Sequence, residues 1–252
     1  MEIELPLQWL EAALLVAVRI TAFIVIAPPF SHGSIPMRVR GAMGATLALA
    51  VTPRAIDDYV PMQTWQYAAA IVQEIISGAA LGFLVFLMFA AVQTAGGFID
   101  LMGGFSLGMM FDPATGVNGA QFQQLFYIAA LALMVSSEAY MMIMAGIFRS
   151  FDALPLGAAV SSSGLGQSLA VGVGQMFLSA LEIAGPLLLV LFLADAGLGL
   201  LTRVAPALNV LTIGFPLKIF ITIALAGTVF VVLPAAVNSL VTQGIDLFRG
   251  VI

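Results

Sequence analysis

The sequence has no cysteine, one histidine and few charged residues. Without cysteine, disulfide bonds, thiol catalysis and thiolate metal sites are excluded. Because His32 is the single histidine, a histidine-rich metal site and a haem held by two histidines are excluded as well. The net charge is −5 and there are no basic runs, which argues against nucleic acid as a partner.

The chain is instead strongly apolar. Hydrophobic residues make up 62% and charged residues 8% of its 252 residues, whereas ordinary soluble domains have about 45–50% and about 25%. No polar stretch is long enough to form a separate soluble domain. The first residues are acidic where a cleaved signal peptide would be basic, so we expect the first apolar segment to be retained. This composition predicts a membrane protein, or a part of an apolar assembly that behaves like one.

Six apolar segments cover about 7–27, 41–51, 67–97, 122–148, 168–201 and 210–237. None shows the alternation of a β-strand, so we predict an all-α fold of hydrophobic helical hairpins with broken or kinked helices. The second segment is too short to cross a bilayer, which takes about 20 residues. We expect Pro186 to kink or break the fifth segment, Pro216 to bend the sixth, and Pro234 to end it.

Charged residues lie inside most of these segments. They are Glu11, Arg19, Glu74, Glu138, Glu182, Asp195 and Lys218. A charge at membrane depth costs about 2.5–17 kcal/mol, so we expect these helices to pack against protein rather than lipid. Two interpretations stay open for the carboxylates: pairing with a basic residue of this chain or of a partner, and a proton relay. If all six segments span, the loops on each side hold three arginines, and loop charge gives no orientation.

Residues 156–167 are small and polar, which is typical of a flexible connector. This connector predicts two parts, residues 1–160 with four segments and residues 161–252 with two. The second part would be a helical hairpin that turns at 203–209, where Pro206 and Asn209 are turn formers.

A glycine-rich stretch covers about 95–121, between two long helices. It holds seven glycines interleaved with large methionine and phenylalanine side chains. Glycine permits tight folding and methionine fills irregular gaps, so this stretch predicts a deformable apolar plug that could seal a channel. The alternative is a mobile surface loop. A phosphate-binding loop is not indicated, because the Lys-Ser/Thr ending is missing.

Short motifs occur in a fixed order along nearly the whole chain. They are Arg19 with Ala27-Pro28-Pro29-Phe30, Glu74-x-x-x-Gly78-x-x-x-Gly82, Asp100-x-x-x-Gly104, Phe111-Asp112-Pro113, Ser150-Phe151 with Leu154-Pro155-Leu156, Arg203-x-x-Pro206, and Gly214-Phe215-Pro216-Leu217-Lys218. In this order and spacing the chain resembles the FliR/SctT family, subunits of flagellar and virulence type III secretion export gates. One departure is Ser137-Glu138-Ala139, which stands where members often carry Asp-Gly-His.

The resemblance implies a channel-forming subunit that joins FliP-like and FliQ-like subunits in a closed secretion pore. It places the chain as a multi-pass protein of the bacterial inner membrane, within the flagellar basal body and its export apparatus. Residues 1–160 would be the FliP-like part and 161–252 a FliQ-like helical hairpin. FlhB-like and FlhA-like export components, unfolded secreted proteins and membrane lipid would be further partners.

The resemblance also implies roles for two groups of residues. The pore plug or gate would comprise Gly103, Gly104, Phe105, Ser106, Gly108, Met109, Met110, Phe111, Asp112, Pro113 and Gly116. Interface or charge-pairing residues would be Arg19, Glu74, Asp100, Glu138, Glu182, Arg203 and Lys218.

Two other classes of function remain as alternatives. A small-solute secondary transporter would bind its solute between glycine-broken helices, but it would show inverted repeats, and the four-plus-two division offers none. A membrane enzyme would need a clustered catalytic set, which the single histidine does not supply. We therefore predict no catalytic residue, no cofactor and no metal site.

Overall fold

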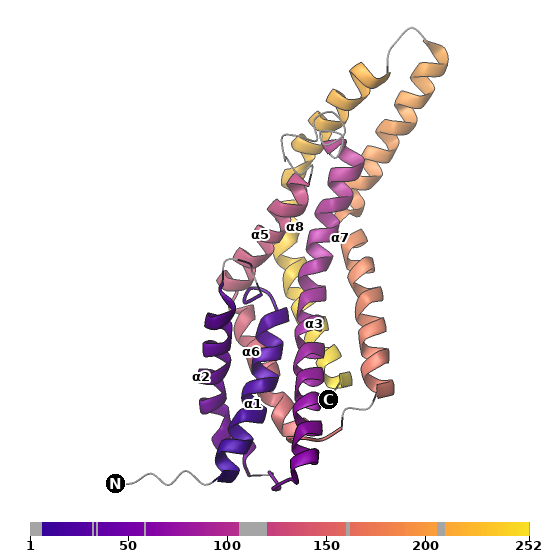
Figure 1. Cartoon of the computed structure of the whole chain (residues 1–252). Helices are drawn as coiled ribbons and strands as arrows, with labels where there is room; N and C mark the ends of the chain where they lie inside the picture. Colours follow the sequence, from indigo (N-terminus) through magenta and orange to yellow (C-terminus); the bar gives the residue numbers. More distant parts are fainter. Residues whose placement is uncertain are drawn as a thin grey trace. The chain divides into compact units, whose positions relative to one another are not determined.

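A computed structural model describes residues 7–31, 33, 35–57, 59–105, 120–159, 162–205 and 210–251. Among these residues every regular element is helical and there is no strand (Figure 1), which confirms the all-α prediction. The helices are α1 (Leu7–Ile26), α2 (Met37–Ala55), α3 (Thr64–Gly103), α5 (Gln121–Ser136), α6 (Ala139–Ala153), α7 (Ser162–Val204) and α8 (Val210–Val251).

Several of these helices have the length and composition of membrane spans. In the described part of the chain there are four, namely α1, α3, most of α7 and most of α8. The pair α5 and α6 would count as a fifth if the two helices together make one broken span. Helix α2 is not among them, as expected from the second segment, although it is longer than predicted.

Helix α8 corrects the prediction that Pro234 ends the last segment. The helix passes through both Pro216 and Pro234 and continues to Val251. Its buried side chains keep helical spacing on both sides of Pro234, at Val229, Leu233, Val237, Leu240 and Val241. Continuous packing on one face thus outweighs the lost backbone hydrogen bond, as happens in long apolar helices. Helix α7 likewise continues through Pro186 without a break.

The fourth predicted segment is two helices rather than one. The helix is interrupted at Ser137-Glu138. Glu138 has φ 58°, and α6 begins immediately after it. For a residue other than glycine, this left-handed conformation costs about 1–2 kcal/mol. Glu138 is the position at which the resemblance leads one to expect glycine, which adopts such a backbone freely.

The chain forms two compact units. Unit 1 comprises residues 1–88, 137–173 and 241–252, and unit 2 comprises residues 89–136 and 174–240. Helices α3, α7 and α8 each contribute to both units. The predicted parts 1–160 and 161–252 are consecutive stretches of sequence, whereas each compact unit combines several stretches. The division into these two parts therefore stays a prediction.

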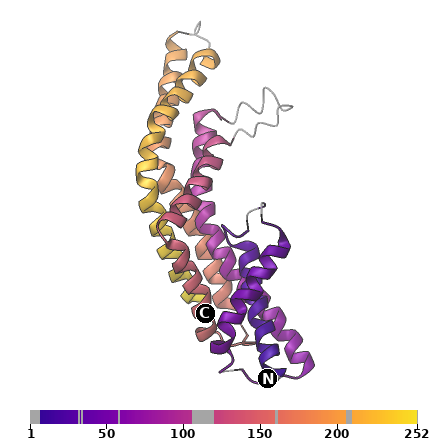
Figure 2. The same ribbon diagram turned by 90° about the vertical axis from the view of Figure 1, so that its left-hand side faces the viewer.

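In unit 1, α1 packs closely against α2 and α3 through glycines. A Cβ atom on Gly82 would lie 2.9 Å from the carbonyl oxygen of Phe23, and one on Gly78 would overlap the carbonyl oxygen of Arg19. On α2, a Cβ atom on Gly44 would overlap the hydroxyl of Thr21. Figures 1 and 2 show α1 and α2 side by side. The close approach that Gly78-x-x-x-Gly82 permits is therefore realised.

In unit 2, aromatic side chains join α5 to α8. The rings of Phe122 and Phe126 meet edge to face with centroids 6.1 Å apart, and those of Phe126 and Phe230 with centroids 5.3 Å apart. Edge-to-face pairs add about 0.5–1.5 kcal/mol to the burial of the rings. Helices α7 and α8 run side by side in this unit (Figures 1 and 2). In the sequence, α7 precedes and α8 follows the predicted turn at 203–209.

The contact at Gly78 gives a first prediction. Gly78→Ala should lower the free energy of unfolding by about 1–3 kcal/mol, because the added methyl group meets backbone atoms of α1 that cannot move aside. Gly166→Ala is the matched control, since a Cβ atom on Gly166 of α7 would meet nothing within 4 Å. Thermal unfolding of the full-length chain in detergent, followed by circular dichroism, measures both. Equal stability of the two variants would contradict the close contact.

Candidate functional site

Among the described residues, the most deeply buried charges form an ion pair between α1 and α3. The side chains of Arg19 and Glu74 are 0% and 1% exposed. Arg19 Nε donates to Oε2 of Glu74, and Nη2 donates to Oε1 at 3.0 Å. Such a two-pronged arginine–carboxylate contact is the strongest geometry for this pair. Charge pairing within the chain, one of the two interpretations left open by the sequence, is what the structure shows for these two residues.

The other donors of Arg19 are directed to the C-terminal end of α6. They reach the carbonyl oxygens of Ser150 and Leu154, each at 3.0 Å, and the hydroxyl of Ser150 at 3.4 Å. The guanidinium carbon also lies 4.3 Å from the centre of the Phe151 ring. A cation is favoured here because the C-terminal end of a helix carries partial negative charge.

Glu74 has a further partner beyond α6. Its Oε1 accepts the backbone N–H of Gly157 at 2.9 Å. Gly157 has φ 75°, a left-handed backbone conformation that favours glycine. We name the cluster of Arg19, Glu74, Ser150, Leu154 and Gly157 the Arg19 centre. It joins α1, α3, α6 and the following turn, and it leaves no donor of the guanidinium free for a substrate.

The other embedded charges have varied surroundings. In unit 2, Lys218 donates to Asp195 at 2.9 Å. In unit 1, the carboxylate of Glu11 accepts the hydroxyl of Tyr59 at 2.7 Å. Burial, together with this hydrogen bond, raises the pKa of Tyr59 above its usual value. Three further residues that were assigned to interfaces or pairing are exposed, namely Glu138, Glu182 and Arg203.

In unit 2, Asp100 holds the start of α5. This aspartate near the end of α3 is buried. Its two carboxylate oxygens accept the backbone N–H groups of Phe122 and Gln123, each at 2.9 Å. An acceptor there satisfies the unpaired first N–H groups of a helix, and its negative charge suits the helix dipole. Asp100 therefore caps a helix that begins about twenty residues later, a role that local sequence patterns do not reveal.

Around Asp100 the chain leaves α3 and enters α5 at neighbouring points. Gly104 ends α3 with φ 87°, the left-handed conformation usual after a helix. The ring of Phe105 meets that of Phe122 edge to face, with centroids 5.3 Å apart. We name Asp100, Gly104, Phe105, Phe122 and Gln123 the loop base.

The loop base includes only the beginning of the predicted plug. Gly103, Gly104 and Phe105 lie at the end of α3. The other predicted plug residues lie outside the described residues: Ser106, Gly108, Met109, Met110, Phe111, Asp112, Pro113 and Gly116. The plug therefore stays a prediction.

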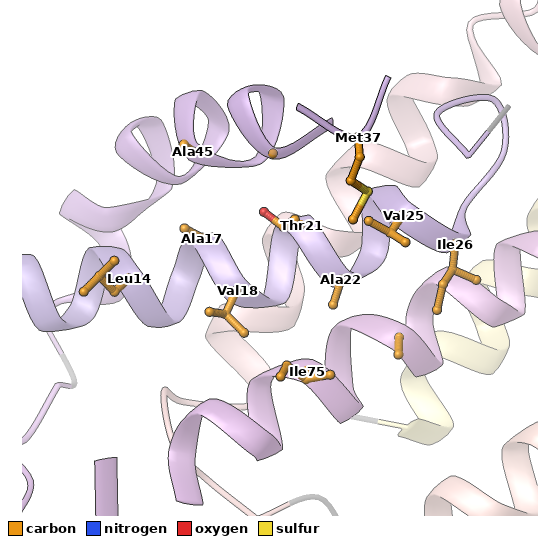
Figure 3. A pocket seen from close by; sticks show the side chains of 12 residues that line it. Leu14, Ala17, Val18, Thr21, Ala22, Val25, Ile26, Met37, Ala45 and Ile75 are labelled. Atoms are coloured by element: carbon orange, nitrogen blue, oxygen red, sulfur yellow. The ribbon is translucent and has the colours of Figure 1, made fainter. Parts of the chain in front are cut away.

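Unit 1 also has an apolar groove between α1, α2 and α3, with a volume of about 500 Å³. Figure 3 shows Val18 and Ala22 of α1, Met37 of α2 and Ile75 of α3 around it. Of the described residues that line it, Thr21 is the one polar side chain and none is charged. The groove suits an apolar occupant but has no group that would select one.

Among the described residues, no group of three or more histidine, cysteine, aspartate or glutamate side chains could hold a metal ion. The two clusters defined above act on the fold: the Arg19 centre joins helices, and the loop base holds the ends of the glycine-rich stretch together.

The Arg19 centre gives a second prediction. Arg19→Met should lower the free energy of unfolding by about 3–5 kcal/mol, because it leaves the carboxylate of Glu74 buried without its cation. The matched control is Arg54→Gln, which removes an ion pair with Asp152 whose side chains are 71% and 41% exposed. Exposed pairs contribute at most about 1 kcal/mol. Both variants can be unfolded in detergent beside the unchanged chain. Similar decreases in the free energy of unfolding would contradict a larger contribution from the buried pair.

Comparison with known proteins agrees with the resemblance seen in the motifs. Residues 10–244 match the family described as "Bacterial export proteins, family 1". The chain is 32% identical to the flagellar biosynthetic protein FliR of Bacillus subtilis (strain 168), over 96% of this chain and 94% of that protein. It is 30% identical to the flagellar biosynthetic protein FliR of Escherichia coli (strain K12), over 98% and 94%.

A relative from another kind of system is similar over a shorter range. The chain is 28% identical to the Yop proteins translocation protein T of Yersinia pestis, over 79% of this chain and 78% of that protein. The match from residue 10 to residue 244 covers nearly the whole sequence. The prediction of a FliR/SctT-type protein is confirmed, and the chain belongs to the bacterial export proteins, family 1.

Proposed function

We propose that this chain is a structural, channel-forming subunit of a flagellar or type III protein export gate in the bacterial inner membrane. It would assemble with FliP-like and FliQ-like subunits into a closed secretion pore, next to FlhB-like and FlhA-like components. The observation that carries the proposal is the similarity, over nearly the full length, to proteins named for flagellar biosynthesis and Yop translocation. Transport would be driven by other components.

The surfaces of α7 and α8 support an assembly with partners. Many large apolar side chains of these helices are exposed, among them Phe177, Leu181, Phe192, Leu193, Phe220, Ile223, Val231 and Val232. The most apolar stretch of α8 is only 22% buried within the chain, whereas that of α3 is 67% buried. Apolar surface of this extent marks contact with other proteins or with lipid, and helices of FliP-like and FliQ-like subunits would supply it.

The loop base supports a plug. Because Asp100 caps α5 and the ring of Phe105 meets that of Phe122 edge to face, the described residues on either side of segment 106–119 lie close together. A segment tied at both ends can fill a pore and yield without separating the helices beside it. Its glycines and methionines suit a deformable apolar seal.

Shortening the loop tests the plug. Removal of residues 106–112 should let ions and small molecules leak across the membrane of growing cells, because the seal would lose its apolar side chains, while secretion persists or changes. Asp100→Asn should cause a smaller leak, because the loop base loses the charge that holds the first N–H groups of α5. Dye entry and ion leakage can be measured in cells whose export assembly is confirmed by purification. Unchanged leakage in such cells would rule out the plug.

The partners provide a separate test. Full-length chain expressed alone should be unstable, and co-expression with FliP-like and FliQ-like subunits should raise its yield and its melting temperature by covering the apolar faces of α7 and α8. Size-exclusion chromatography of the purified material shows whether one particle contains all three chains. A stable monomer with native helix content, which does not bind these subunits, would contradict the proposed assembly.

A further inference from the structure

In unit 2, one side of α7 carries a regular row of exposed residues. They are Glu182, Pro186, Leu189, Leu193, Ala196 and Leu200. The three leucines are 61%, 60% and 67% exposed, so the described residues of the chain leave this row uncovered. We name the row the outer face of α7.

The spacing of the outer face is that of a helix-packing surface. Its residues follow one another at alternating intervals of four and three residues. Such a repeat, with about 3.5 residues per turn, keeps one stripe of a helix against a second helix over several turns. The buried residues Ile183, Leu187 and Leu191 lie on another side of α7. The helix therefore has one surface for its own chain and a separate one for a neighbour.

Glu182 places a negative charge in this otherwise apolar face. Its side chain is exposed, and among the described residues it has no hydrogen bond or ion pair. The two described basic residues of unit 2 do not serve it. Lys218 donates to Asp195, and Arg203 lies 21 residues further along α7, about 31 Å away by the helical rise. The cation for Glu182 must therefore come from outside the described part of this unit.

The charge decides which neighbour suits the outer face. A carboxylate pressed against lipid chains or a purely apolar helix would lose its hydration and gain no partner. A helix with a lysine or arginine opposite Glu182 would pair the charge, while its apolar side chains cover the leucines. One polar position in an apolar seam also fixes the register of two helices, so Glu182 would set the alignment of the neighbour.

We propose that the outer face of α7 binds an apolar helix of a partner subunit, and that this helix presents a lysine or arginine to Glu182. The inference rests on the proposed function, because it takes the partner from the same export assembly. It adds which surface of α7 is used, which charge the partner helix carries and where along α7 that charge lies.

Co-expression of the full-length chain with its FliP-like and FliQ-like subunits tests the pairing. Size-exclusion chromatography measures how much particle containing all three chains is recovered. Glu182→Lys should lower this recovery about tenfold or more, because it brings two like charges together. Glu182→Leu should lower it as well, because the partner's charge is left buried without its carboxylate. Asp57→Lys is the matched control: it makes the same change of charge at an exposed residue of unit 1 and should leave recovery unchanged.

A compensating change separates charge pairing from a loss of fold. A photoreactive amino acid at position 189 of the assembled chain should cross-link to the helix that covers the outer face. Replacing the basic residue of that helix opposite position 182 by glutamate should restore the assembly of Glu182→Lys, which repair of a misfolded chain would not explain.

Two results would overturn the inference while the proposed function stands. One is full recovery of the particle with Glu182→Leu, since lipid or an apolar helix would then suffice. The other is a cross-linked helix with no basic residue opposite position 182. If the unchanged chain forms no particle with these subunits, the proposed function fails and the inference fails with it.

Discussion

A buried arginine in an apolar chain needs a carboxylate to balance its charge and further oxygen atoms to accept its remaining N–H groups. Much of the packing of unit 1 depends on the groups that bind Arg19. Glu74 of α3 supplies the charge, and the end of α6 supplies two carbonyl oxygens. Since each partner comes from a different segment, α1, α3 and α6 must pack together for the arginine to be buried. The same carboxylate fixes the turn at Gly157. Removal of either charged residue would leave the other charge buried without a partner, which strongly destabilises the fold.

Close helix packing is the second condition for this arrangement. The guanidinium of Arg19 reaches Glu74 because Gly78 and Gly82 bring the backbone of α3 up to α1 one and two turns further along. Motifs that lie far apart in the sequence, around Arg19, Glu74, Ser150 and Leu154, therefore meet in one place. Unit 2 uses a charge differently: Asp100 is satisfied by the N–H groups at the start of α5 and so keeps together the two ends of a glycine-rich stretch.

The sequence predicts those features that depend on local pattern. Apolar segments with proline boundaries predict α1 within one residue at its end, and the charges inside the segments predict protein neighbours. Features decided by distant packing are missed. Pro234 does not end α8, because the buried face of the helix continues beyond it, and the break at Glu138 rests on a backbone conformation that composition does not reveal. The cap that Asp100 provides and the pairing of Arg19 with Glu74 depend on contacts across 22 and 55 residues, which no single segment encodes.

In this chain the Arg19 centre joins the helices of unit 1, many apolar side chains of α7 and α8 are exposed, and the loop base holds the ends of the glycine-rich stretch. We expect the Arg19 centre to make α1, α3, α6 and the turn at Gly157 one cooperative unit. Hydrogen–deuterium exchange of Glu74→Gln, compared with the unchanged chain, tests this most directly. Exchange should become faster at residues 74–82 and 150–157 together, including the Gly157 amide, with no change at the start of α5. Faster exchange at Gly157 alone would contradict it.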